Sequence, residues 1–229
     1  MSYQYTYAYM GLIFLIIWLI LYLWREDTRK QMISISFIFG FAGVGADILY
    51  TQDWWSPLTL TNTRIGFEAF IVGFCIAGIA TVIYEDLFKK RIRKRKNVNK
   101  EKVFAKELKI TLLMLFLFFG TFYFFNLNSF IATIITLSVP TLIIYLKRKD
   151  LIIDSIVSGF LMLFIAFIVY SLLELITPGW VEEFWHFTNV PNFIFLNMPL
   201  DDMIWYFLTG MLIGPLYEFW YETKLVENN

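Results

Sequence analysis

The feature that most constrains this chain is a series of apolar runs, each close to the length of one membrane crossing. A helix needs about 20 apolar residues to cross the ~30 Å hydrocarbon core of a bilayer. Only helices and closed barrels satisfy backbone polar groups in lipid, and unbroken runs of this length favour helices. The sequence therefore predicts an all-α membrane protein with about seven transmembrane helices, over residues 8–24, 31–50, 65–84, 108–125, 129–146, 151–173 and 200–221.

Composition agrees with this class. Of the 229 residues, 59% are hydrophobic and 17% are charged, whereas soluble domains carry roughly 25% charged residues. The single cysteine, Cys75, lies in an apolar run, so a disulfide framework and a cysteine metal site are both excluded.

Lysine and arginine predict the orientation of the helices, because these residues accumulate in cytoplasmic loops. The strongest basic segment is residues 89–96. If it lies inside, Arg64 is the only one of the 19 lysines and arginines that falls outside. The chain is therefore predicted to be a multi-pass protein of the cell membrane, with its N-terminus outside and its C-terminus cytoplasmic. Beside a helix end, the basic run is better explained by topology and anionic lipid than by nucleic-acid binding, so no nucleic-acid partner is expected.

Two parts of the chain resemble each other. Residues 32–41 correspond to 151–160, and residues 66–85 correspond to 199–218, which ends in the same Tyr-Glu pair. Both triplets of helices run in the same direction, which predicts a parallel 3+1+3 repeat with its site near the repeat interface. The expected organisation is a single membrane domain, with a homo-oligomer left open: 1–229 overall, repeat 1 about 1–88, a basic loop 89–106, a linker helix about 107–126 and repeat 2 about 127–224.

Acidic residues near helix ends are candidate functional groups, because ionisable side chains are costly in a membrane. Glu85 and Glu218 lie at the inner ends and are expected to form structural ion pairs with the basic segments. Glu68 and Asp201 occupy equivalent positions at the outer ends, so they are expected to face each other across the interface. Capping of helix N-termini is the alternative explanation for the outer acids. The same outer layer also contains Asp47, Glu174 and Asp202.

The two outer connections, residues 51–64 and 177–199, are rich in aromatic residues that include Trp54 and Trp55. Tryptophan accumulates at membrane interfaces, so an aromatic belt is one interpretation. The other interpretation is a lid of aromatic side chains over a cavity that opens to the lipid.

These features resemble the lycopene cyclase domain family, which comprises small, all-helical prokaryotic carotenoid cyclases built from two related halves. The mark of the family is Pro-x-Glu followed by Glu or Asp at the start of a membrane helix. Pro-Leu-Asp-Asp at residues 199–202 stands in that place, with Asp201 instead of the usual Glu. In the first half, residues 66–69 stand in the equivalent place, with Gly instead of Pro and Ala instead of the second acid.

The resemblance implies an isomerase of carotenoid biosynthesis that cyclises the end group of a linear carotenoid or isoprenoid arriving from the membrane lipids. Such a reaction needs an acid, surroundings that tolerate a carbocation, and a base. A carboxylic acid in apolar surroundings can stay protonated, and aromatic rings stabilise cations. No redox change occurs, so no cofactor is expected, and no metal. The predicted catalytic residues are Glu68, Asp201 and Asp202, and the predicted substrate-binding residues are Pro199, Trp205, Tyr206, Phe74, Trp54 and Trp55.

Two other classes stay open: a non-catalytic lipid- or carotenoid-binding relative, and a small-solute transporter with a parallel repeat. A transporter needs a polar path that opens to both faces, whereas a cyclase needs an aromatic cavity that opens sideways between residues 65–84 and 200–221. Gly210 and Gly214 favour the cyclase, because they permit close helix packing that would seal the inner half of this interface. His186 is the only histidine, and with Glu182 and Glu183 it supplies too few ligands for a metal site within a helical bundle.

Overall fold

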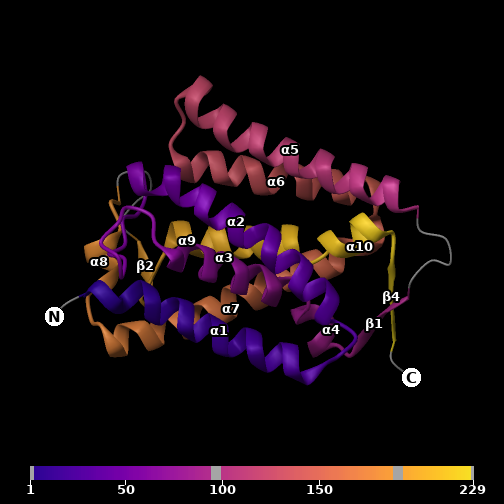
Figure 1. The fold of residues 1–229 in the computed structure, drawn as a ribbon, viewed down its shortest axis with the longest axis horizontal. Coiled ribbons are helices and arrows are strands. Elements are labelled where there is room, and N and C mark those ends of the chain that lie inside the picture. The colour runs from indigo at the N-terminus through magenta and orange to yellow at the C-terminus, as the bar shows by residue number, and fades with distance from the viewer. Residues whose placement is uncertain (1–2, 94–98, 188–192, 228–229) are drawn as a thin grey trace.

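The computed structural model describes residues 3–93, 99–187 and 193–227. The chain is mostly helical, and most of its helices run along one common direction (Figure 1). Two small antiparallel sheets, β1 with β4 and β2 with β3, accompany the helices. The elements are the short 3-10 helices η1 (Tyr3–Tyr5) and η2 (Lys149–Leu151), the helices α1 (Thr6–Trp24), α2 (Arg29–Asp53), α3 (Phe67–Ala80), α4 (Ile83–Leu87), α5 (Lys100–Phe125), α6 (Ser129–Lys147), α7 (Ile152–Ile176), α8 (Trp180–Phe184), α9 (Leu200–Ile213) and α10 (Leu216–Tyr221), and the strands β1 (Lys90–Arg93), β2 (Ile194–Phe195), β3 (Met198–Pro199) and β4 (Lys224–Glu227).

Within the described residues, five helical segments are long and apolar enough to cross a membrane. They correspond to five of the seven predicted runs, and they support a multi-pass membrane protein. The helix α5 begins at Lys100 rather than near residue 107, because the Asn99 side chain caps it by accepting hydrogen bonds from the backbone of Glu101 and Lys102. The five segments are Tyr3–Trp24, Arg29–Asp53, Lys100–Phe125, Ser129–Lys147 and Lys149–Ile176.

The remaining two apolar runs each form an interrupted helix. The first is α3 followed by α4, and its last turn tightens where the Val82 amide donates to the carbonyl of Ile79 at 3.1 Å. The second is α9 followed by α10, which are separated by Gly214 and Pro215. Proline has no amide proton and its ring displaces the preceding turn, so the helix breaks there.

These two interrupted helices lie at the centre of the bundle. The helix α3 packs on α1 and α2, and α9 packs on α6 and α7, while α5 lies at the periphery against α6 (Figure 1). Glycines bring the backbones close together. A Cβ atom on Gly73 would lie 2.6 Å from the Phe39 carbonyl oxygen, and one on Gly210 would lie 2.8 Å from the Gly159 Cα. Gly214 likewise packs on Ser158, so Gly210 and Gly214 do permit close packing, but on α7 and not across the interface with residues 65–84 that the sequence predicted.

The Gly210 contact makes a testable prediction about stability. The change Gly210→Ala should destabilise the fold by about 1–3 kcal/mol, because the methyl group would overlap the backbone of α7. Gly45→Ala is the matched control, since a Cβ at Gly45 meets no atom within 4 Å. The measurement is thermal unfolding in detergent. Equal melting temperatures for the two variants would contradict this account of the α7–α9 contact.

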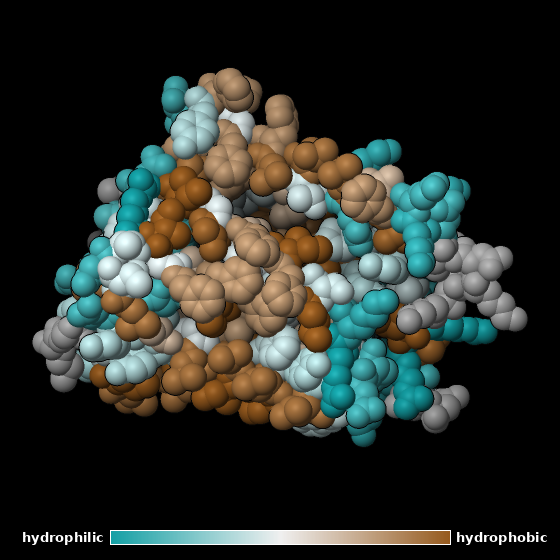
Figure 2. All heavy atoms as spheres, in the orientation of Figure 1, coloured by the Kyte–Doolittle hydropathy of each residue, from teal (hydrophilic) through white to brown (hydrophobic). Residues whose placement is uncertain are grey.

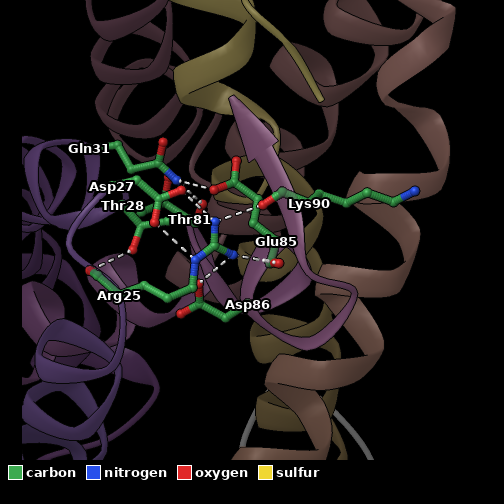
Figure 3. A network of polar contacts seen from close by, with 8 residues as sticks. All are labelled: Arg25, Asp27, Thr28, Gln31, Thr81, Glu85, Asp86 and Lys90. Atoms are coloured by element: carbon green, nitrogen blue, oxygen red, sulfur yellow. Dashed lines mark hydrogen bonds and ion pairs between the residues drawn. The ribbon is translucent and has the colours of Figure 1, made fainter. Parts of the chain in front are cut away.

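Arg25 ties the connection between α1 and α2 to the end of α4 (Figure 3). Its guanidinium donates to the backbone carbonyls of Glu85 at 2.8 Å and Lys90 at 2.7 Å. It also donates to both carboxylate oxygens of Asp27, at 3.1 and 2.6 Å, and Nη1 lies 3.1 Å from Asp86 Oδ1. The hydrogen bonds from Arg25 hold the pKa of Asp27 below its usual value. The arginine is therefore a fixed structural clamp.

Arg148 makes the corresponding contacts in the second half of the chain. It donates to both oxygens of Asp150, at 2.8 and 2.7 Å, and to the backbone carbonyls of Glu218 at 3.2 Å and Thr223 at 2.8 Å. Each arginine thus follows a long helix, binds an aspartate two positions later, and holds the backbone around an interrupted helix.

The surface separates into three zones along the bundle. Figure 2 shows hydrophilic residues gathered at the two ends and a broad apolar band between them. The start of α1 and the strand β4 lie at opposite ends of the bundle (Figure 1). This is the pattern expected of a membrane-embedded chain, whose middle faces hydrocarbon and whose ends face water.

Candidate active site

A pocket of about 80 Å³ lies where α1, α2, α3, α7 and α9 converge near the outer connections. Two carboxyl groups line it, Asp47 from α2 and Asp202 from α9. The rest of the wall is apolar or aromatic, and Gly43 and Gly73 form part of it on the α2 and α3 side. The aromatic residues that line it are Tyr7, Tyr50, Trp54, Trp55, Tyr170, Trp185, Trp205 and Tyr206.

Asp47 is the acid on the α2 side of this pocket. Its side chain is buried, with 4% of the residue exposed. The Tyr7 hydroxyl of α1 donates to its Oδ2 atom at 3.1 Å, and the Trp55 indole also interacts with it. These contacts fix the orientation of the carboxyl group. Both come from uncharged side chains, so they do not neutralise a carboxylate.

Asp202 is the acid on the α9 side, in the first turn of that helix. It is also buried, and the Tyr170 hydroxyl of α7 donates to its Oδ2 atom. The Trp185 indole interacts with the same carboxyl group. Each pocket acid is therefore held by one tyrosine hydroxyl and approached by one tryptophan from an outer connection.

The other two predicted catalytic acids do not line this pocket. Glu68 accepts a hydrogen bond from the Leu60 backbone amide at 2.6 Å, and it therefore braces the connection that precedes α3. Asp201 accepts from the Trp54 indole at 2.6 Å and from the Asp202 amide at 3.0 Å. The structure thus brings Asp202 together with Asp47, and not Glu68 with Asp201, on the pocket wall.

Four of the six predicted substrate-binding residues, Trp54, Trp55, Trp205 and Tyr206, line the pocket. Pro199 instead immediately precedes α9 and pairs with Ile194 in the small β2–β3 sheet. Phe74 packs elsewhere, with its ring centre 5.2 Å from those of Trp18 and Phe37. Its ring therefore belongs to a separate aromatic cluster at the side of α3.

The two outer connections cover the pocket together. The Ser56 amide donates to the Phe184 carbonyl at 2.8 Å, and the His186 amide donates to the Trp54 carbonyl at 2.9 Å. The rings of Trp55 and Trp185 pack with their centres 5.1 Å apart. Because Trp54 and Trp185 are buried, the lid interpretation fits these side chains better than an interfacial belt.

An apolar groove of about 350 Å³ adjoins the pocket and lies among α2, α3, α5, α6 and α9. Figure 2 shows the apolar face hollowed between α2 and α5. Its lining, drawn from the described residues, contains no charged side chain. This groove touches both α3 and α9, but α2, α5 and α6 also form its walls, so it differs from the expected cavity bounded by α3 and α9 alone. Pocket and groove share Gly43, Ala46, Tyr50, Gly73, Ile76 and Trp205.

A second group of acids lies at the other end of the bundle. Glu85 accepts from the Gln31 side chain at 2.7 Å, and its carboxyl group interacts directly with that of Glu218. Within the described residues, neither glutamate side chain forms an ion pair, so the expected pairing with the basic segments is wrong. Arg25 and Arg148 bind the backbone carbonyls of these glutamates instead.

Comparison with known proteins agrees with the sequence resemblance. Residues 128–220, which include α6, α7 and α9, match the family model described as lycopene cyclase. The resemblance is thereby confirmed over residues 128–220, which carry a lycopene cyclase domain match. No curated protein matches the chain, and no solved structure matches it.

Asp47 is the site residue that sequence reasoning placed in the outer layer without selecting it. Asp47 lies outside the positions that the family motif covers. The comparison of the two repeats pointed to residues 66–69 instead. A usable signal exists, because Asp47 is the only charged residue in the apolar run 31–50. Among the described residues, no group of three or more histidines, cysteines or acids could hold a metal ion.

Proposed function

We propose that this chain is a membrane-embedded cyclase that closes the end group of a linear carotenoid or related isoprenoid by acid-initiated, non-redox chemistry. The observation that carries the proposal is the pair of buried acids, Asp47 and Asp202, on an aromatic pocket that continues into an apolar groove. The lycopene cyclase match over residues 128–220 supports the same reaction class.

In the proposed reaction, the polyene lies in the groove and its end group enters the pocket. The carboxylic acid of Asp202 gives its proton to one carbon of the terminal double bond, and the other carbon becomes a tertiary cation. A nearby double bond supplies the electron pair for the new ring bond, which moves the positive charge into the ring. The Asp47 carboxylate then removes a proton from a neighbouring carbon and restores a double bond. One proton enters and one leaves, so the product is an isomer of the substrate.

The aromatic wall stabilises the cationic stage of this reaction, because the face of an aromatic ring attracts a cation without forming a bond to it. Trp205 is fixed for this role by its indole, which donates to the Tyr50 hydroxyl at 3.1 Å. Tyr50 in turn accepts from Thr133 at 3.0 Å. This chain of hydrogen bonds holds the rings rigidly where the pocket meets the groove.

Glu68 and Asp201 have positioning roles in this proposal. Asp201 orients the Trp54 indole at the pocket wall, and Glu68 braces the loop that leads into α3. We assign the acid role to Asp202 because it belongs to the acidic motif of residues 199–202 in the matched domain.

The deciding experiment is expression of the full chain in cells that accumulate lycopene. We expect a new pigment with the same mass as lycopene and a blue-shifted absorption, because ring closure involves no redox change and either twists the terminal double bond of the polyene out of plane or moves it out of conjugation. Unchanged lycopene that co-purifies with the protein would instead identify a carotenoid-binding relative. Transport of a water-soluble solute by reconstituted vesicles would overturn the cyclase proposal. The groove does not favour transport, because no described residue that lines it is charged.

We also propose the seven-crossing, parallel 3+1+3 arrangement, with the N-terminus outside and the C-terminus in the cytoplasm. The equivalent clamps of Arg25 and Arg148, and the equivalent breaks of the two central helices, support the repeat. A reporter fused after Asn229 should therefore be cytoplasmic, and one fused before Ser2 should be external. Location of both reporters on one side would contradict an odd number of crossings.

A further inference from the structure

A groove of about 260 Å³ lies at the basic end of the bundle, between the start of α5, the end of α6 and α10. It is separate from the pocket and the apolar groove, with which it shares no lining residue. Its lining holds four basic side chains and one carboxylate. These are Lys106, Lys109, Lys147, Arg148 and Glu222, with Ile110 and Phe219 as the apolar part of the wall.

Two of the four basic side chains are already engaged within the protein. Lys106 forms an ion pair with Glu222, and its Nζ lies 5.7 Å from the ring centre of Phe219. Arg148 is held by Asp150, as described above. Lys109 and Lys147 are different: both are exposed, and neither forms an ion pair with a described residue. The groove therefore keeps two cations available for an anion.

The surroundings of these two lysines suit a lipid better than a soluble anion. On α5, Lys109, Leu112 and Phe116 share one face by their spacing, and Leu112 and Phe116 are 54% and 71% exposed. On α6, Lys147 is the last residue and Leu146 before it is 80% exposed. The free cations thus stand where an exposed apolar surface ends, which is the level of phospholipid phosphates in a bilayer.

We propose that this groove binds the phosphate of an anionic phospholipid, with Lys109 and Lys147 as the ligands and an acyl chain along the Leu112–Phe116 face of α5. Basic pockets between transmembrane helices are known to bind acidic headgroups in this way. A free phosphate ion would meet the same two lysines but would gain nothing from the apolar face below them.

The test is native mass spectrometry of the full chain in detergent, titrated with phosphatidylglycerol or with phosphatidylcholine of the same acyl chains. Wild type should retain phosphatidylglycerol preferentially. The double change Lys109→Gln and Lys147→Gln should weaken this binding at least about tenfold, as expected for two lysines at a membrane surface. Lys109→Arg with Lys147→Arg should restore binding, which guards against a variant that merely misfolds.

The matched control is Lys102→Gln with Lys149→Gln, which removes the same charge from exposed positions outside the groove. It should retain wild-type binding. An equal loss in this control would show a general charge effect and overturn the site. Displacement of the lipid by excess inorganic phosphate would overturn the proposal in favour of a soluble anion, and equal binding of both lipids would overturn it outright.

Discussion

Asp202→Asn should lower the yield of cyclised product about 10²–10⁴-fold, the range that general acid–base catalysis contributes. The amide keeps the shape of the side chain and can still accept from Tyr170, but it has no acidic proton to deliver. Asp47→Asn should act in the same direction, because it removes the proposed base. The measurement is cyclic product per amount of folded protein in lycopene-accumulating cells.

Glu182→Gln and Glu183→Gln are the matched controls for these two changes, because both residues are exposed in α8 and line neither cavity. Their activity should equal that of wild type. Asp201→Asn and Glu68→Gln should have smaller effects, about tenfold, since each weakens one hydrogen bond that positions the pocket wall or the loop. If Glu68 and Asp201 proved essential while Asp47 proved dispensable, the reaction would use the acids predicted from the repeat.

The second large effect is expected from substitutions of Gly45, which should lower activity by blocking the access of the substrate to the pocket. It lines the apolar groove, and a Cβ atom placed on it meets no atom within 4 Å. Side chains of increasing size at this position should therefore fill the groove without disturbing the fold. In the series Gly45→Ala, Gly45→Leu and Gly45→Phe, activity should fall with side-chain volume. The phenylalanine should cost about 100-fold or more, because a displacement on the order of 1 Å at the reacting end has that effect.

The melting temperature of each Gly45 variant separates blocked access from misfolding, because only the activity should change. Purified protein incubated with lycopene in detergent provides the activity measurement. Activity independent of side-chain volume at this position would show that the substrate does not occupy the groove between α2 and α5.

The positions of the long helices could be predicted from the sequence because each is a continuous apolar run, and lipid leaves the backbone few alternatives. The breaks at Val82 and Gly214 could not be predicted from hydropathy alone, because the apolar run continues through them. Hydropathy also failed to predict that α5 begins as early as Lys100. Its first turns carry lysines, yet a capped helix can extend beyond the hydrocarbon.

The candidate site was predicted in part. The family motif identified Asp202, and the aromatic outer connections identified Trp54 and Trp55, all of which line the pocket. The repeat identified Glu68, whose bond to Leu60 turns it toward its own loop. Asp47 was not selected because side-chain direction around a helix cannot be read without knowing which face packs against the neighbouring helices. The pairing of each pocket acid with a tyrosine from another helix depends on tertiary structure alone.

The pocket joins residues that lie far apart in the sequence, and this has a consequence for biosynthesis. Tyr7 belongs to α1, which is synthesised before the other long helices described here, whereas Tyr206 belongs to α9, which is synthesised after all of them. While α5 to α7 are being inserted, α3 still lacks its contact with α9. Asp202 on α9, the proposed acid, thus reaches the pocket that it shares with Asp47 after all the long helices have been synthesised. Under the proposed mechanism, a nascent chain arrested before Leu200 should therefore be inert toward polyenes, because it lacks Asp202.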